Sequence, residues 1–86
     1  MSALPSEAAT GRHRTVQDVA RWLDPNPALT GTQRDVALAY ADLAVHLLAL
    51  VGLDDPELTR ALSGLTSSKD SAVRASIAAD RAASRR

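Results

Sequence analysis

Basic and aromatic side chains in two parts of the chain could bind an anionic ligand. Lys69 falls on an apolar face at helical spacing, between the directions of Leu62 and Leu65. A lysine in such a position reaches out to solvent, pairs with an acid, or provides a positive charge for a bound anion. Arg21 and Trp22 combine a cation with a flat ring, which suits a phosphate and a base. The alternative interpretation of Trp22 is a ring that covers the core.

Charge is unevenly distributed, and arginines gather in the last third of the chain. Residues 60–86 hold five Arg and one Lys against two Asp, whereas residues 24–57 hold one Arg and six acids. The aligned arginines could grip phosphates with their planar donor forks, or form a solvated face in which Asp70 pairs with Arg74. The net charge of zero argues against binding nucleic acid over the whole surface. Four arginines share the face opposite to the apolar residues: Arg60, Arg74, Arg81 and Arg85.

Catalytic patterns are absent from the sequence. Asp42 and His46 are spaced i,i+4 and could transfer a proton or bind a metal, but His13 is the only other histidine and Cys is missing. We interpret the pair as structural. Glycine-rich phosphate loops, zinc-binding helices and nucleophile elbows do not occur either. We therefore expect no enzyme, no metal and no cofactor.

Helical periodicity predicts three elements that would position these residues. Thr15 is a suitable N-cap for a short first helix, which Asp24-Pro25-Asn26-Pro27 must end because proline disfavours α geometry in the preceding residue. Thr30 or Thr32 can cap a second helix that runs to about Val51. We expect residues 1–14 to be a flexible segment, residues 15–83 a single helical-hairpin domain and residues 84–86 a basic tail.

The connection between the two long helices has strong local signals. Gly52 suits a Schellman ending, and Asp55-Pro56 reads as an N-cap followed by a first-turn proline. The third helix should run from Pro56 to about Ala83. A bend within Ser63–Ser68 is the competing interpretation, because five of those six positions hold poor helix formers. A short connection between two long helices predicts an antiparallel hairpin.

The second helix is apolar on too many sides for a chain of this length. Only Asp42 and His46 interrupt the otherwise apolar or amphipathic positions between Val36 and Val51, and a helix apolar nearly all round is buried on several sides. One seam, including Tyr40, Leu43 and Leu47, is expected to pack in the hairpin. The other seam predicts an all-α homo-oligomer, with a subunit interface at Leu38, Val45 and Leu48. The apolar run is too short to span a bilayer and no signal pattern precedes it, so we expect a soluble cytoplasmic protein.

The third helix also carries a resemblance to a known family. Asp55-Pro56-Glu57-Leu58-Thr59-Arg60-Ala61-Leu62 and Lys69-Asp70-Ser71-Ala72-Val73-Arg74-Ala75 are similar to a pattern in small actinobacteriophage proteins. Those proteins resemble the helical-hairpin domain of phage anti-CBASS and anti-Thoeris proteins, which sequester nucleotide signals. The similarity covers about residues 15–79, and residues 63–68 depart from it.

The resemblance implies a non-enzymatic bacteriophage protein of immune evasion in the infected bacterial host. It would bind cyclic di- or trinucleotides between the subunits of a homo-oligomer, often a hexamer. Lys69 and Arg74 are the matching residues and would contact phosphates, with Arg21, Trp22 and Tyr40 as the other ligand-binding candidates. Two alternatives remain open: a helical adaptor that binds a host or phage protein, and a DNA-binding regulator using the arginine face.

Overall fold

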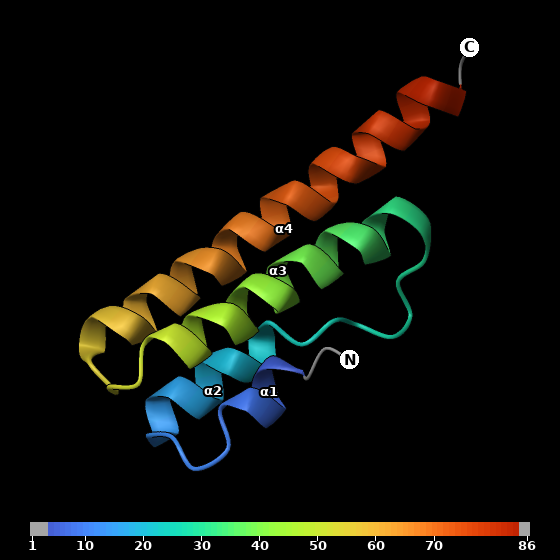
Figure 1. Ribbon diagram of the computed structural model, residues 1–86. Coiled ribbons are helices and arrows are strands. Elements are labelled where there is room, and N and C mark those ends of the chain that lie inside the picture. Colours follow the sequence, from blue (N-terminus) through green and yellow to red (C-terminus); the bar gives the residue numbers. More distant parts are fainter. Residues whose placement is uncertain (1–3, 85–86) are drawn as a thin grey trace.

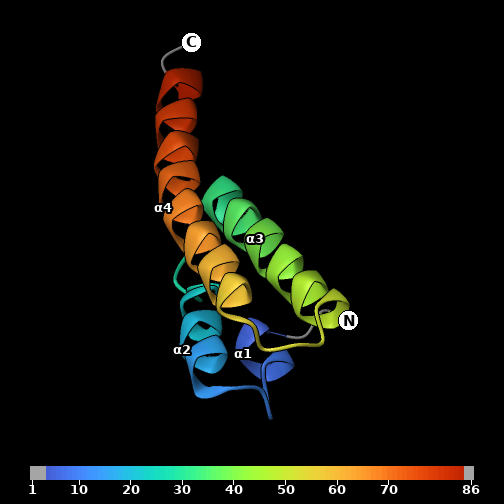
Figure 2. The same cartoon turned by 90° about the vertical axis from the view of Figure 1, so that its left-hand side faces the viewer.

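The structure, a computed structural model, describes residues 4–84 and is helical over 77% of this range, without strands. Helices α3 (Gly31–Leu50) and α4 (Pro56–Ser84) form an antiparallel hairpin (Figure 1). Two shorter helices, α1 (Pro5–Ala8) and α2 (Arg14–Trp22), lie against the half of the hairpin nearest its turn. Figure 2 shows the two layers, with α2 below α4 and α1 below α3. The all-α class and the helical hairpin are as predicted.

The start and continuity of α4 follow the sequence signals. Asp55 caps the helix, because its Oδ1 accepts the Glu57 backbone N–H at 2.8 Å. The helix is uninterrupted through residues 63–68, so the competing bend does not occur. Thr66 Oγ1 donates to the Leu62 carbonyl at 3.2 Å, which gives that hydroxyl a partner within the helix.

Two of the predicted helix ends are wrong. The N-cap of α2 is His13 instead of Thr15: His13 Nδ1 accepts the Thr15 backbone N–H at 3.2 Å. At the end of α3, Val51 is extended (φ −103°, ψ 93°) and Gly52 does not adopt a positive φ. The Schellman ending is therefore absent, and the last carbonyls of α3 find other donors.

The predicted mobile segment is part of the fold from residue 4 onward. Pro5 and Ala9 are buried, and the Ser6 backbone N–H donates to Asp24 Oδ1 at 2.9 Å. The sequence did not indicate helix α1, because its small residues show no apolar periodicity and pack only where α2 and α3 provide a surface for them. Residues 1–3, and Arg85 and Arg86 of the predicted basic tail, lie outside the described residues, while Ser84 ends α4.

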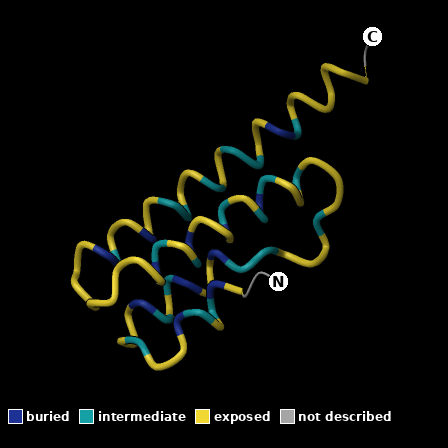
Figure 3. Tube along the Cα trace, viewed as in Figure 1, coloured by how far each residue is buried: buried dark blue, intermediate teal, exposed yellow. Residues whose placement is uncertain are grey.

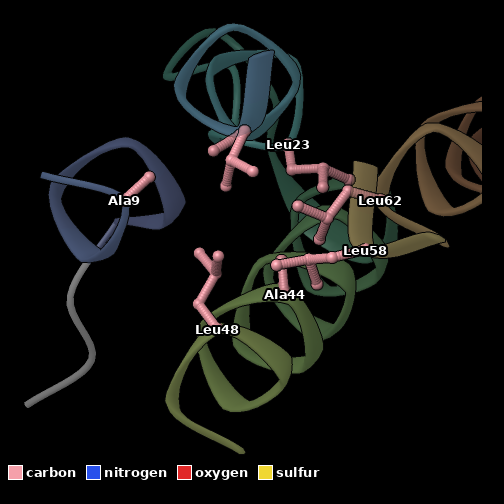
Figure 4. Packing of buried hydrophobic residues seen from close by; sticks show 8 residues of the cluster. Ala9, Leu23, Ala44, Leu48, Leu58 and Leu62 are labelled. Carbon is pink, nitrogen blue, oxygen red and sulfur yellow. The ribbon is translucent and has the colours of Figure 1, made fainter. Parts of the chain in front are cut away.

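The core lies where all four helices meet. Figure 4 shows buried side chains from α2, α3 and α4 converging there, with Ala9 from the end of α1. Along the trace, buried positions recur on the inner sides of the helices and become sparse toward the end of α4 (Figure 3). The cluster consists of Ala9, Val16, Ala20, Leu23, Ala44, Leu48, Leu58 and Leu62.

The buried side of α3 is different from the one predicted. It is lined by Ala37, Ala41, Ala44 and Leu48. Leu48, expected at a subunit interface, is only 4% exposed and belongs to the chain's own core. Alanines let α1 and α4 approach α3 closely, and this displaces the leucines to the flanks.

Apart from Leu48, the leucines of the two predicted seams are therefore exposed or half-buried. Leu43, expected in the hairpin core, is 45% exposed and Leu50 is 76% exposed. Leu38 and Val45 are half-buried beside the core, and their contact with another subunit stays a prediction.

Candidate functional site

Three of the predicted ligand-binding residues meet at the C-terminal end of α2. Lys69 Nζ donates to the Trp22 carbonyl at 2.9 Å, so a positive charge sits at the negative end of that helix. Trp22 is 72% exposed and does not cover the core. Arg21 and Asp18 line the same shallow depression beside the ring. We call this site the α2 corner: it holds the cations Lys69 and Arg21, the exposed face of Trp22, and one carboxylate, Asp18, which would repel an anion.

Arg74 and Tyr40 do not join this corner. Arg74 is exposed and projects about 140° around α4 from Lys69. Tyr40 Oη lies 2.5 Å from Ser68 Oγ. Because Ser68 and Lys69 project about 100° apart, Tyr40 lies at a different side of α4 from Trp22. The five predicted residues therefore do not form one pocket.

The other charged patterns form few interactions. Within residues 4–84 the ion pairs are Arg12–Asp54 and an exposed Arg60–Glu57 pair, so the expected Asp70–Arg74 pair is not formed. Asp42 and His46 are exposed and make no hydrogen bond to each other. No group of three or more His, Asp or Glu side chains in the described range could hold a metal ion.

A cluster around Arg12 joins the turn between α1 and α2 to the turn between α3 and α4, and it was not predicted. Its guanidinium donates to Asp54 Oδ1 at 2.5 Å and to the Leu48 and Val51 carbonyls at 3.0 and 2.8 Å. The His13 backbone N–H donates to Asp54 Oδ2 at 2.7 Å. The His13 N–H and the Arg12 guanidinium together hold the pKa of Asp54 below its ordinary value of 3.8. The Arg12 guanidinium thus supplies hydrogen-bond donors to carbonyls at the end of α3, where the predicted Schellman ending would have supplied backbone N–H groups.

A cleft of about 470 Å³ lies next to this cluster, where α2 and α4 begin. Its walls include His13, Thr15, Asp55 and Thr59, with the two threonine hydroxyls 3.4 Å apart. The side chains of His13 and Asp55 already accept backbone N–H groups at the two helix starts. Arg60 also lines the cleft and donates to Glu57, so the side chains described here bond mainly to the protein itself, where the two helices begin.

An apolar surface of the hairpin, lined by no residue of α1 or α2, follows the contact between α3 and α4. Two hollows follow one another along the contact between α3 and α4, and we call them together the outer groove. The second has a volume of about 410 Å³. Nearby, Leu50 and Leu53 are 76% and 71% exposed. The groove is lined by Ala39, Tyr40, Leu43, Leu65 and Ser68, then by Leu47, Val51, Leu53, Leu58 and Ala61, with Asp55 and Glu57 at its end.

Comparison with protein-family models, curated proteins and solved structures finds no match to this chain. Among the described helices, none combines the length and the apolarity needed to cross a bilayer. The function therefore has to be inferred from the groove and the α2 corner themselves.

Proposed function

We propose that this protein is a non-enzymatic helical interaction module that binds another protein surface through the outer groove. The observation that carries this proposal is the exposure of leucines beside the groove, 76% for Leu50, 71% for Leu53 and 45% for Leu43. Covering one leucine fully is worth roughly 1.5–3 kcal/mol, so a partner that covers all three gains several kcal/mol. A contiguous apolar surface of this kind is typical of a binding site.

The side of α4 next to the groove supports the same proposal. Beyond Glu57, the charged residues of α4 in the described range project toward the core edge or from the outer edge of the helix, beside the groove side and not from its middle. The groove side instead holds small, uncharged residues, which let a partner helix approach closely without burying a charge. They are Ala61, Gly64, Ser68, Ser71, Ala75, Ala79 and Ala82.

A pair of matched variants tests the proposal by affinity capture from a cell lysate. Leu50→Glu places a charge on the groove, whereas Ala49→Glu places the same charge at the next exposed position of α3, toward its polar edge. We expect the wild-type chain and Ala49→Glu to retain a stoichiometric protein partner on the groove, either a foreign protein or a second, untagged copy of the chain, and Leu50→Glu to lose it. A partner retained equally by all three chains would contradict the proposal.

The α2 corner favours a second candidate function, sequestration of a cyclic di- or trinucleotide immune signal in an infected bacterial cell. Lys69 and Arg21 would contact phosphates, and the exposed face of Trp22 would stack on a base. Calorimetry with a panel of cyclic di- and trinucleotides tests it. We expect micromolar binding that Trp22→Ala abolishes and Tyr40→Ala leaves unchanged. Absence of binding across the panel would exclude this function.

A further inference from the structure

The outer groove leaves a small chain with an incomplete core. The largest side chains that are fully buried are Leu23, Leu62, Val16 and Pro5, whereas Leu43, Leu50 and Leu53 remain in water. Chains of this size bury a limited fraction of their surface and often complete their core by association. If the fold depends on covering this apolar surface, the partner that covers it must be present whenever the chain is present. A second copy of the chain meets that requirement.

The groove side of the hairpin is large enough for a stable dimer. The 20 residues of α3 span about 30 Å and the 29 residues of α4 about 44 Å, and each helix is about 10 Å wide. The exposed side of the hairpin thus covers roughly 700 Å² in projection. This projected area is of the same order as the roughly 800 Å² of accessible surface that each partner buries in a specific protein interface.

The charges beside this surface select one arrangement of two copies. Asp35 and Asp42 project from the outer edge of α3, and Arg60 and Arg74 from the outer edge of α4. If the two-fold axis runs parallel to the helices, α3 of each copy faces α4 of the other, and acidic edges meet basic edges. If the axis is perpendicular to the helices, α3 faces α3 and like charges meet. Complementary edges favour the first arrangement.

Resting on the proposed function, we infer that the occupant of the outer groove is a second copy of this chain, packed with parallel hairpins as a two-fold four-helix bundle. The register of the hairpin adds a specific pair. Thr32 Oγ1 reaches Asp80 Oδ1 at 3.2 Å and Tyr40 Oη reaches Ser68, so Asp35 lies at nearly the level of Arg74. In the parallel arrangement Asp35 of one copy faces Arg74 of the other, twice per dimer.

Native mass spectrometry and sedimentation equilibrium between about 1 and 200 µM test this inference. We expect the wild-type chain at twice its 9.1 kDa mass, Ala49→Glu likewise, and Leu50→Glu as a helical monomer by circular dichroism. Leu53→Glu, in the turn outside any helix, provides a second disruption that does not depend on helix stability. A dimer unaffected by both leucine variants would overturn the inference.

A charge exchange tests the arrangement separately. Asp35→Arg should raise the dissociation constant about tenfold through two like-charge contacts, and adding Arg74→Asp should restore it to within about twofold. A dimer in which the double variant stays as weak as Asp35→Arg would overturn the parallel arrangement. A wild-type monomer at 200 µM would overturn self-association altogether. If that monomer captures a foreign protein that Leu50→Glu loses, the interaction module stands and only the second copy is excluded.

Discussion

Replacing Leu62 by alanine should remove a large part of the stability of the fold. Leu62 is fully buried between α4 and the helices beneath it, whereas Leu50 on the same hairpin is 76% exposed. Leu62→Ala removes apolar groups worth about 0.8 kcal/mol each and leaves a cavity, for a loss of about 3 kcal/mol. An 86-residue domain has a free energy of unfolding of roughly 4–13 kcal/mol. We therefore expect the melting temperature to fall by about 12–24 °C.

Urea unfolding followed by far-ultraviolet circular dichroism measures this loss, with Leu50→Ala as the matched control. At a protein concentration of about 1 µM, we expect Leu50→Ala to cost less than about 1 kcal/mol, because little surface is uncovered within the chain. At about 200 µM its cost should grow if the outer groove is occupied, while the cost of Leu62→Ala stays the same. Equal losses for the two variants at 1 µM would refute the assignment of the core.

Five further substitutions, at four positions, probe the turns and the helix backbone. Arg12→Ala should lower the free energy of unfolding by about 2 kcal/mol and Arg12→Lys by less, in urea titrations, because two carbonyls at the end of α3 lose their donors. Asp54→Asn should flatten the acid limb of the stability profile between pH 7 and 3. The lowered pKa of Asp54 means that its stabilisation is complete above its unfolded value and is lost as pH falls through the lower folded value. Gly64→Ala should raise the melting temperature, because Gly64 lies in an open helical position. Gly31→Ala should lower the melting temperature, because φ at Gly31 is +59°. A lower melting temperature for Gly64→Ala than for Gly31→Ala would contradict these backbone conformations.

Local sequence signals predicted the two long helices well. Proline at the first turn and Asp55 before it fix the start of α4 whatever the rest of the chain does, and α4 accordingly begins at Pro56. The uninterrupted helix through Ser63–Ser68 also shows that packing outweighs several weak propensities. The short helix α1 escaped prediction, because its order depends on contacts with α2 and α3 and not on its own periodicity.

Helical spacing predicted which residues share a direction, but not which direction faces the core. In α3 the leucine-rich seam has the larger apolar side chains, yet the alanine side is buried because several helices must approach it closely. The same limit applies to the candidate sites. Lys69 and Trp22 are 47 residues apart, and the Lys69 amine bonds to the backbone carbonyl of Trp22, a contact that no side-chain pattern predicts.

The bond between Arg12 and Asp54 has a consequence for the order of events during synthesis. The two residues are 42 positions apart, so the N-terminal helices emerge from the ribosome before the carboxylate that will hold them emerges. At roughly 5–20 residues per second this interval lasts about 2–8 s. For those seconds the nascent α1 and α2 expose the apolar sides that later rest on the hairpin, which is the period when a chaperone or a protease would find them.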